Sequence, residues 1–323
     1  MGKTAFVFPG QGSQRVGMGL HLLDQRPDLL DTYYREADDI LGLPLSKLCW
    51  EGPEEALRDT SVTQPAVFLT SIATLDVLRG HGIGPALVAG HSLGEYTALV
   101  SAGVLDWTDA LRLVRRRGEL MAEVNVRVPG RMAAVIGLSL ATVETLCARA
   151  AAGTGQVVEV ANDNEPGQVV VSGQAAAVDL LCEAARDAGA LKVAVLEVGA
   201  PFHSSLMADI EEEFAAELAE VDLRAPRVPV VSGVTADLLG SAVDIRDCLR
   251  RQLTGRVRWT GAVRALAAAG AEAFVEVGPG HVLSGLCRRI APEVPGHRTD
   301  DARRLARTVA LTGHRTARPG TAA

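Results

Sequence analysis

The sequence has few aromatic residues and an excess of acidic over basic charge. Aromatic side chains make up 4% of the 323 residues, too few to build the stacking surface on which single-stranded nucleic acids bind. The formal net charge is −7, so the chain has no general positive field to attract a phosphate backbone. We therefore expect no nucleic-acid partner, and any anionic partner must bind at a local basic patch.

The cysteines show no pairing pattern, and we expect no leader segment. The five cysteines are widely spaced and form no Cys-x-x-Cys pair, which argues against a disulfide framework or a bound metal and fits a reducing compartment. The first residues do not read as a signal peptide, and no uninterrupted apolar run reaches the roughly 18 residues of a membrane span. These absences predict a cytoplasmic protein that has no membrane partner.

The most informative stretch that is present is Gly90-His91-Ser92-Leu93-Gly94. A short apolar segment, 85–89, precedes it as a buried strand would, and an Ala- and Leu-rich segment follows as a helix would. Gly-x-Ser-x-Gly between a strand and a helix is typical of a nucleophile elbow, in which the serine hydroxyl stands at the tip of the sheet. The free N–H groups at the start of the helix can stabilise a developing oxyanion.

A serine nucleophile needs a base, because its hydroxyl is hardly ionised at neutral pH. His203 is the best candidate, since it lies at a loop-to-helix junction where the chain returns to its first domain. His91 is a poor base for Ser92 because successive side chains point apart. The pair predicts acyl transfer through a covalent ester, but the spacing leaves open whether the acceptor is water, as in a hydrolase, or a thiol or alcohol, as in a transferase.

The pattern of elements predicts an α/β fold with two domains. A parallel-sheet, hydrolase-like large domain would comprise residues 1–127 and 196–299. Segment 128–195 has the order βαββαβ, which predicts an inserted ferredoxin-like small domain. Within it, 162–167 is expected to be a turn. The polar, Arg-rich residues 300–323 are expected to be a flexible tail.

Six motifs resemble those of malonyl-CoA:acyl carrier protein transacylases and of the acyltransferase domains of polyketide synthases. They occur in the order typical of that family and span about residues 4 to 290. The motifs are Phe8-Pro9-Gly10-Gln11-Gly12-Ser13-Gln14, Gly90-His91-Ser92-Leu93-Gly94-Glu95-Tyr96, Arg117-Gly118, Pro166-Gly167-Gln168, Phe202-His203-Ser204 and Glu276-Val277-Gly278-Pro279-Gly280.

The resemblance implies a role for each site residue. Ser92 would be acylated, and His203 would act as general base and then as general acid. The backbone N–H groups of Gln11 and Leu93 would form the oxyanion hole. No acidic residue would complete a triad; instead a main-chain carbonyl near Gln252 would orient the histidine. The residues that the resemblance assigns to substrate binding are Arg117, Gln64, His91, Asn162, Gln168, Phe202 and Gln252.

The resemblance also implies the substrates. Arg117 would hold the distal carboxylate of a malonyl group, and Phe202 with Leu93 favours malonyl over methylmalonyl. The implied reaction moves malonyl from CoA to the phosphopantetheine thiol of an acyl carrier protein, in fatty-acid or polyketide synthesis. No cofactor would be bound, because the partner carries the phosphopantetheine, and the enzyme is expected to be a monomer.

Alternative interpretations remain open at this point. One is an acyltransferase of the same family that uses another acyl group or acts between carrier proteins. Another is a serine thioesterase on the same fold. Because the carrier surface is acidic in most such systems, Arg115 and Arg116 are candidates for a basic patch on which the carrier protein docks.

Overall fold

The larger of two β-sheets has six strands. The computed structural model describes residues 2–198 and 200–316. The sheet order is β10-β9-β1-β2-β7-β8, and every adjacent pair is parallel except β7 with β8. Its strands are β1 (Lys3–Phe8), β2 (Leu87–Gly90), β7 (Val230–Val231), β8 (Leu238–Leu239), β9 (Ala271–Glu276) and β10 (Gly296–Arg298).

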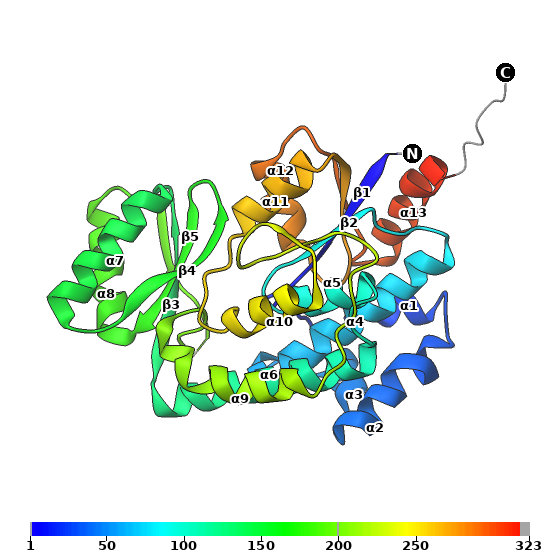
Figure 1. Cartoon of the computed structure of the whole chain (residues 1–323), viewed down its shortest axis with the longest axis horizontal. Coiled ribbons are helices and arrows are strands. Elements are labelled where there is room, and N and C mark those ends of the chain that lie inside the picture. The colour runs from blue at the N-terminus through cyan, green and yellow to red at the C-terminus, as the bar shows by residue number, and fades with distance from the viewer. Residues whose placement is uncertain (1, 199, 317–323) are drawn as a thin grey trace.

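Both faces of this sheet are buried, which is why β1 reads as a continuous apolar run. Phe6 and Phe8 pack into the core on one face, and Ala5 and Val7 pack into a second core on the other. Helices cover the two faces, with α11 and α12 on the opposite side from α4 and α6 (Figure 1). The helices of this part are α1 (Leu20–Leu23), α2 (Glu36–Leu41), α3 (Leu45–Glu51), α4 (Thr60–Gly80), α5 (Gly94–Ser101), α6 (Trp107–Arg127), α9 (Ala208–Ala219), α10 (Ala242–Arg251), α11 (Trp259–Ala268) and α12 (Val282–Ile290).

The smaller sheet has four antiparallel strands in the order β4-β5-β3-β6. Its elements are β3 (Gly130–Ile136), α7 (Leu140–Thr154), β4 (Val158–Glu165), β5 (Gln168–Gln174), α8 (Ala175–Asp187) and β6 (Lys192–Val195). This order confirms the predicted ferredoxin-like unit. Figure 1 shows α7 and α8 together on its outer side. The sheet lies within the predicted range 128–195, although the domain boundaries themselves stay a prediction.

The two faces of the small sheet differ in what they pack against. Ala133 and Val135 of β3 lie in the core beneath α7 and α8. Met132 and Val170 point the other way and join the core of the large part. Successive side chains of a strand point to opposite faces of the sheet. One face of the small sheet therefore forms a core with α7 and α8, and the other face packs against the large part.

Helix α4 is the central helix of the large part. By length and mean hydropathy it could span a membrane, but 83% of its most apolar window is buried inside the protein, as in the core helix of a soluble protein. It begins at Thr60 with Asp59 as its cap. Pro65 is therefore inside the helix and cannot bond the carbonyl of Ser61. Arg115 Nη1 donates to that carbonyl at 2.8 Å instead.

The prediction of a flexible tail from residue 300 is wrong for most of that segment. Helix α13 (Ala302–Thr316) packs beside β10, with Leu305 and Thr308 buried. Thr308 Oγ1 donates to the carbonyl of Arg298 at 2.6 Å. Apolar and small residues on one face of the helix account for its docking, and the arginines lie on the other faces. Residues 317–323 of the predicted tail lie outside the described residues.

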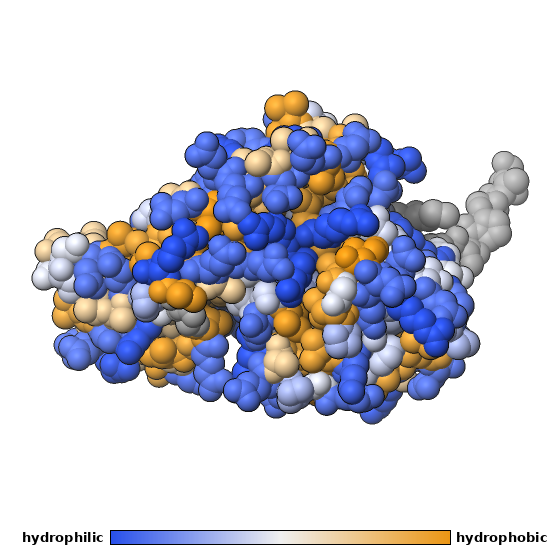
Figure 2. Space-filling view, turned by 90° about the horizontal axis from the view of Figure 1, so that it is seen from below, coloured by the Kyte–Doolittle hydropathy of each residue, from blue (hydrophilic) through white to orange (hydrophobic). Residues whose placement is uncertain are grey.

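The surface and the cysteines agree with the composition. Hydrophilic side chains cover much of the face seen from below, with smaller apolar patches between them (Figure 2). All five cysteines are buried and free, so each packs as a small apolar residue.

Candidate active site

The turn from β2 into α5 forms the predicted elbow. Ser92 has φ 51°, in the left-handed region that non-glycine residues rarely adopt. A Cβ at Gly90 would lie 2.0 Å from the backbone nitrogen of Glu95, and one at Gly94 would lie 2.0 Å from the carbonyl oxygen of Phe8. Glycine is therefore required at both positions, because the turn packs its own backbone and that of β1 against them.

Ser92 and His203, 111 residues apart, form a hydrogen-bonded pair. Ser92 Oγ lies 2.8 Å from His203 Nε2. His203 Nδ1 donates to the backbone carbonyls of Gln252, at 2.9 Å, and Gly255, at 3.2 Å. Because both partners of Nδ1 are acceptors, the proton sits on Nδ1 and leaves Nε2 free to accept one from the serine. Main-chain carbonyls thus take the place of the acidic third member of a triad.

The charge state of His203 follows from its surroundings. Burial, and then the Arg117 guanidinium, lower its pKa to about 3. The imidazole is therefore neutral at neutral pH, as a general base must be before it takes a proton.

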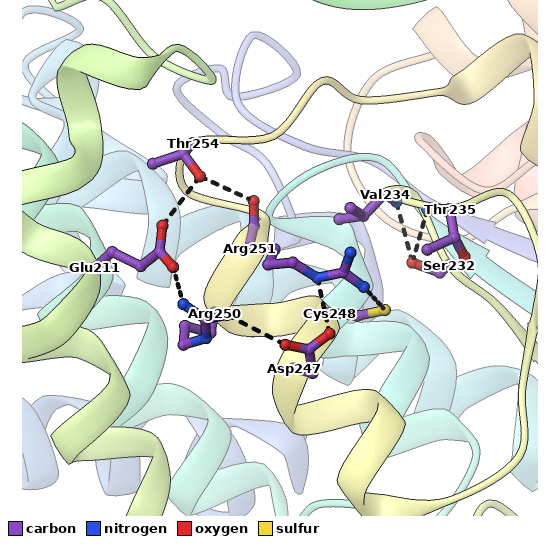
Figure 3. Close-up of polar contacts among 9 residues, drawn as sticks. All are labelled: Glu211, Ser232, Val234, Thr235, Asp247, Cys248, Arg250, Arg251 and Thr254. Atoms are coloured by element: carbon purple, nitrogen blue, oxygen red, sulfur yellow. Dashed lines mark hydrogen bonds and ion pairs between the residues drawn. The ribbon is translucent and has the colours of Figure 1, made fainter.

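A polar network holds the segment that carries these carbonyls. Glu211 of α9 accepts from Thr254 Oγ1 at 3.0 Å and also pairs with Arg250. Arg251 pairs with Asp247 one turn back on α10, at 2.8 Å. Figure 3 shows these contacts tying the end of α10 and the loop after it to α9. The network fixes the backbone that orients His203.

Arg117 of α6 places a buried positive charge beside the nucleophile. Its Nη2 lies 3.0 Å from Ser92 Oγ and 3.1 Å from Gln252 Oε1, and its Nη1 donates to Gln64 Oε1 at 2.7 Å. Among the described residues it forms no ion pair, and burial lowers its pKa. Neutral amides therefore position the guanidinium while its charge stays available for an anionic ligand.

Glu95 is a site residue to which sequence reasoning gave no role. It follows the elbow on α5, is fully buried, and accepts a hydrogen bond from Gln252 Nε2. Burial raises its pKa to about 7, against the opposing effect of this hydrogen bond. The side chain of Gln252 contacts Arg117, and the backbone carbonyl of Gln252 contacts His203. By holding Gln252, Glu95 therefore orients both Arg117 and His203. The only sequence signal was an acidic residue at an otherwise apolar helix start.

A cavity of about 210 Å³ opens in front of Ser92. Its lining includes the predicted residues Gln11, His91, Ser92, Leu93, Arg117, Asn162, Phe202 and His203. The backbone N–H groups of Gln11 and Leu93 have no acceptor among the hydrogen bonds of the described residues, as an oxyanion hole requires before substrate binds. A Cβ at Gly10 would lie 2.5 Å from the carbonyl of His91, so the first loop packs directly on the elbow.

Three residues assigned to substrate binding do not line this cavity. Gln64 and Gln252 lie behind Arg117 and act on it. Gln168 begins β5 opposite Ile136 and is not among the residues that line the cavity, so its role in substrate binding stays a prediction.

The small part contributes an asparagine, Asn164, that was not assigned to the site from the sequence. Segment 162–165 was expected to be part of a turn, but it continues β4 to Glu165. Asn162 and Asn164, two residues apart, therefore both reach the cavity. Asn164 Oδ1 lies 2.8 Å from His91 Nε2, so it holds the ring beside the elbow.

Arg115 and Arg116 are not a free basic patch. Arg115 pairs with Glu119 at 2.6 Å in addition to its bond to the carbonyl of Ser61. Arg116 faces four carboxylates, those of Glu119, Glu123, Glu213 and Glu217. Because carboxylates already compensate the charges of these two arginines, they no longer support a docking site for the carrier protein. In the part of the chain that the structure describes, no cluster of three His, Cys, Asp or Glu side chains could hold a metal.

An elbow serine, a carbonyl-oriented histidine and an oxyanion loop on an α/β sheet define an enzyme that forms a serine acyl ester. The chain belongs to the acyl transferase domain family, whose sequence model matches residues 5–294. It is 46% identical over 291 residues to the malonyl CoA-acyl carrier protein transacylase of Escherichia coli O157:H7, covering 90% of this chain and 93% of that one. It is 43% identical over 290 residues to the protein of the same name from Bacillus subtilis, covering 90% and 91%.

Solved structures show the same likeness. The malonyl-CoA:acyl carrier protein transacylase of Xanthomonas oryzae superposes with a TM-score of 0.92 at 41% identity, covering 97% of this chain and 99% of that one. A malonyl-transacylase solved in complex with its type II polyketide synthase acyl-carrier protein also gives 0.92, at 40% identity over 96% and 99%.

Proposed function

We infer that the protein is a malonyl-CoA:acyl carrier protein transacylase, which moves malonyl from CoA to the phosphopantetheine thiol of a carrier protein. The observation that carries the substrate assignment is the Arg117 guanidinium, which is buried 3.0 Å from Ser92 Oγ and has no carboxylate ion-pair partner in the described part of the chain. A buried cation is costly unless an anion joins it. The distal carboxylate of malonyl is an anion that can pair with the guanidinium in two parallel hydrogen bonds.

The reaction proceeds in two half-reactions. Ser92 Oγ attacks the thioester carbonyl while its proton passes to His203 Nε2, and the N–H groups of Gln11 and Leu93 stabilise the oxyanion. The C–S bond breaks, the leaving sulfur takes the proton from His203, and CoA departs. The carrier thiol then gives its proton to His203 and attacks the ester, and Ser92 recovers its proton as the malonyl-carrier leaves.

The substrate carboxylate also affects the pKa of the general base, His203. Arg117 contributes to the low pKa of His203. A malonyl carboxylate seated on Arg117 offsets that positive field, so His203 becomes a better proton acceptor when the correct substrate is present.

The chemistry needs no bound cofactor, because the pantetheine arms arrive on CoA and on the carrier. The same residues serve fatty-acid and polyketide synthesis. We propose a cytoplasmic location, supported by five free cysteines, and a monomer, since Ser92, His203 and Arg117 already contact one another within a single chain. Light scattering during size-exclusion chromatography tests the second proposal; a dimer mass would contradict it.

Ser92→Ala tests the inferred reaction. Wild-type protein incubated with malonyl-CoA should gain one malonyl group by intact-protein mass spectrometry, and Ser92→Ala should gain none. Without carrier protein, CoA release by the wild-type protein should stop after about one equivalent per enzyme, and continued release should depend on the carrier. Continued fast release without carrier would instead identify a thioesterase, and an adduct on Ser92→Ala would place the nucleophile elsewhere.

A further inference from the structure

A second cavity, of about 540 Å³, lies among α12, β10 and α13. Six basic side chains contribute to its lining: His281, Arg288, Arg298, Arg304, Arg307 and His297. None of the described residues that line it is an aspartate or a glutamate. On a protein of net charge −7, four arginines around one cavity are the reverse of the average surface.

Most of these arginines lack acidic partners. Arg298 pairs with Asp300 at 3.2 Å. Arg288, Arg304 and Arg307 are exposed and form no ion pair within residues 2–198 and 200–316. Arg116 shows the opposite arrangement, with four carboxylates around one guanidinium. Like charges that face one cavity repel each other, and an anion that enters it removes the repulsion.

The helix terminus at this cavity is not what would bind the anion. The N–H groups of Leu283 and Ser284, at the start of α12, already donate to Glu276 at 3.1 and 2.7 Å. This carboxylate compensates the positive end of the helix. An anionic ligand must therefore be held by the arginine side chains, whose planar forks suit phosphate oxygens.

We propose that this cavity binds a small molecule that carries two or more phosphate groups. Its volume is in the range of small-molecule sites, roughly 300–1,000 Å³, and its concave shape suits a compact ligand better than the face of a protein helix. Helix α12 is shared between the two cavities, since Val282, Leu283 and Leu286 line the one at Ser92. The ligand is either the nucleotide end of the CoA donor, a choice that rests on the proposed function, or a free nucleotide that binds on its own.

The first test is direct binding to the full chain. Calorimetric titration with adenosine 3′,5′-bisphosphate, in phosphate-free buffer at low salt, should give saturable binding. Arg307→Glu should weaken it about tenfold or more, since a charge-assisted contact becomes a repulsion. Arg303→Glu makes the same change of charge on an exposed position of α13 that does not line the cavity, and it should change the affinity less than about twofold at moderate salt.

Absence of saturable binding, or equal weakening by both variants, would overturn the proposal. A different outcome would also overturn it: the wild-type protein binds an acidic carrier protein, Arg307→Glu abolishes that binding, and the bisphosphate binds neither the wild type nor the variant. Circular dichroism of both variants checks that α13 is intact.

The second test separates the two sources. Transfer is measured with malonyl-CoA and with malonyl-pantetheine, which lacks the phosphates. If the donor's nucleotide occupies the cavity, Arg307→Glu raises the KM for malonyl-CoA alone. If a free nucleotide occupies it, bisphosphate binding falls and both KM values stay unchanged; either result supports the site. Failure of the wild-type protein to transfer from either donor would refute the proposed function and leave the binding result standing.

Discussion

The two sheets contribute to one cavity in different ways. The large part supplies the groups that touch the reacting atoms, from a turn, a loop and the buried face of α6: Ser92, His203 and Arg117. The small part supplies a wall, through Met132, Asn162, Asn164 and Val170 on one face of an open sheet. The difference teaches that the chemistry depends on strained or buried positions in the large part, while the small part shapes the space. Substitutions in the large part should therefore reduce transfer activity more than substitutions in the small part.

Arg117→Ala should have the largest effect on substrate choice. Malonyl transfer should fall roughly 100-fold or more, because a buried charge-assisted contact to the carboxylate is lost. Acetyl transfer should persist or rise. The acidic limb of its pH profile should move to higher pH, because a cause of the low pKa of His203 is removed.

The matched control is Arg112→Ala, an exposed residue on the same helix, which should leave kcat/KM unchanged for both donors. Equal losses of malonyl and acetyl transfer in Arg117→Ala would show that the guanidinium only supports the fold.

Glu95→Gln tests the buried link between Arg117 and His203. The folded-state pKa of Glu95 is raised to about 7 from 4.5. Between these two pH values the carboxyl group therefore keeps its proton in the folded protein and has lost it in the unfolded chain. Its contribution to stability is therefore greatest below pH 4.5 and is lost as pH rises to about 7. The unfolding free energy of wild type relative to Glu95→Gln should fall by about 1–3 kcal/mol over that window.

Urea denaturation at several pH values measures the difference. Glu123→Gln, the same change at an exposed position of α6, is the matched control. A flat difference for Glu95→Gln over this range would mean that Glu95 does not titrate between pH 4.5 and 7.

Sequence reasoning found the large part's chemistry because that chemistry demands particular residue types. Only glycine fits at positions 90 and 94, and a serine at a strained corner needs a histidine. It assigned no site role to Glu95 or Asn164, since their roles arise from partners 157 and 73 residues away in sequence, which no local pattern reveals. It misjudged α13 because an arginine-rich composition hid the helical spacing of Leu305, Thr308 and Thr312, which are buried residues of this helix.

Phe202→Ser should have a smaller effect, confined to selectivity. The ring lines the cavity and is 7% exposed, so a smaller side chain makes room for the 2-methyl group of methylmalonyl. One methyl group in an apolar pocket is worth about tenfold, and the ratio of methylmalonyl to malonyl transfer should rise by about that factor. Competition between the two CoA esters measures the ratio, and an unchanged ratio would mean that another wall sets the limit.

Asn164→Ala should have the smallest effect and gives the sharpest test of the division between the two parts. The substitution removes the hydrogen bond to His91 Nε2, worth about 1 kcal/mol, and leaves Ser92, His203 and Arg117 with all their partners. The KM for malonyl-CoA should rise a few-fold, while acylation of Ser92 at saturating donor should proceed at nearly the wild-type rate. Single-turnover kinetics separates the two quantities. A hundredfold loss in the acylation rate would show that the small part holds a group acting on the reacting atoms, and the distinction between chemistry and shape would fail.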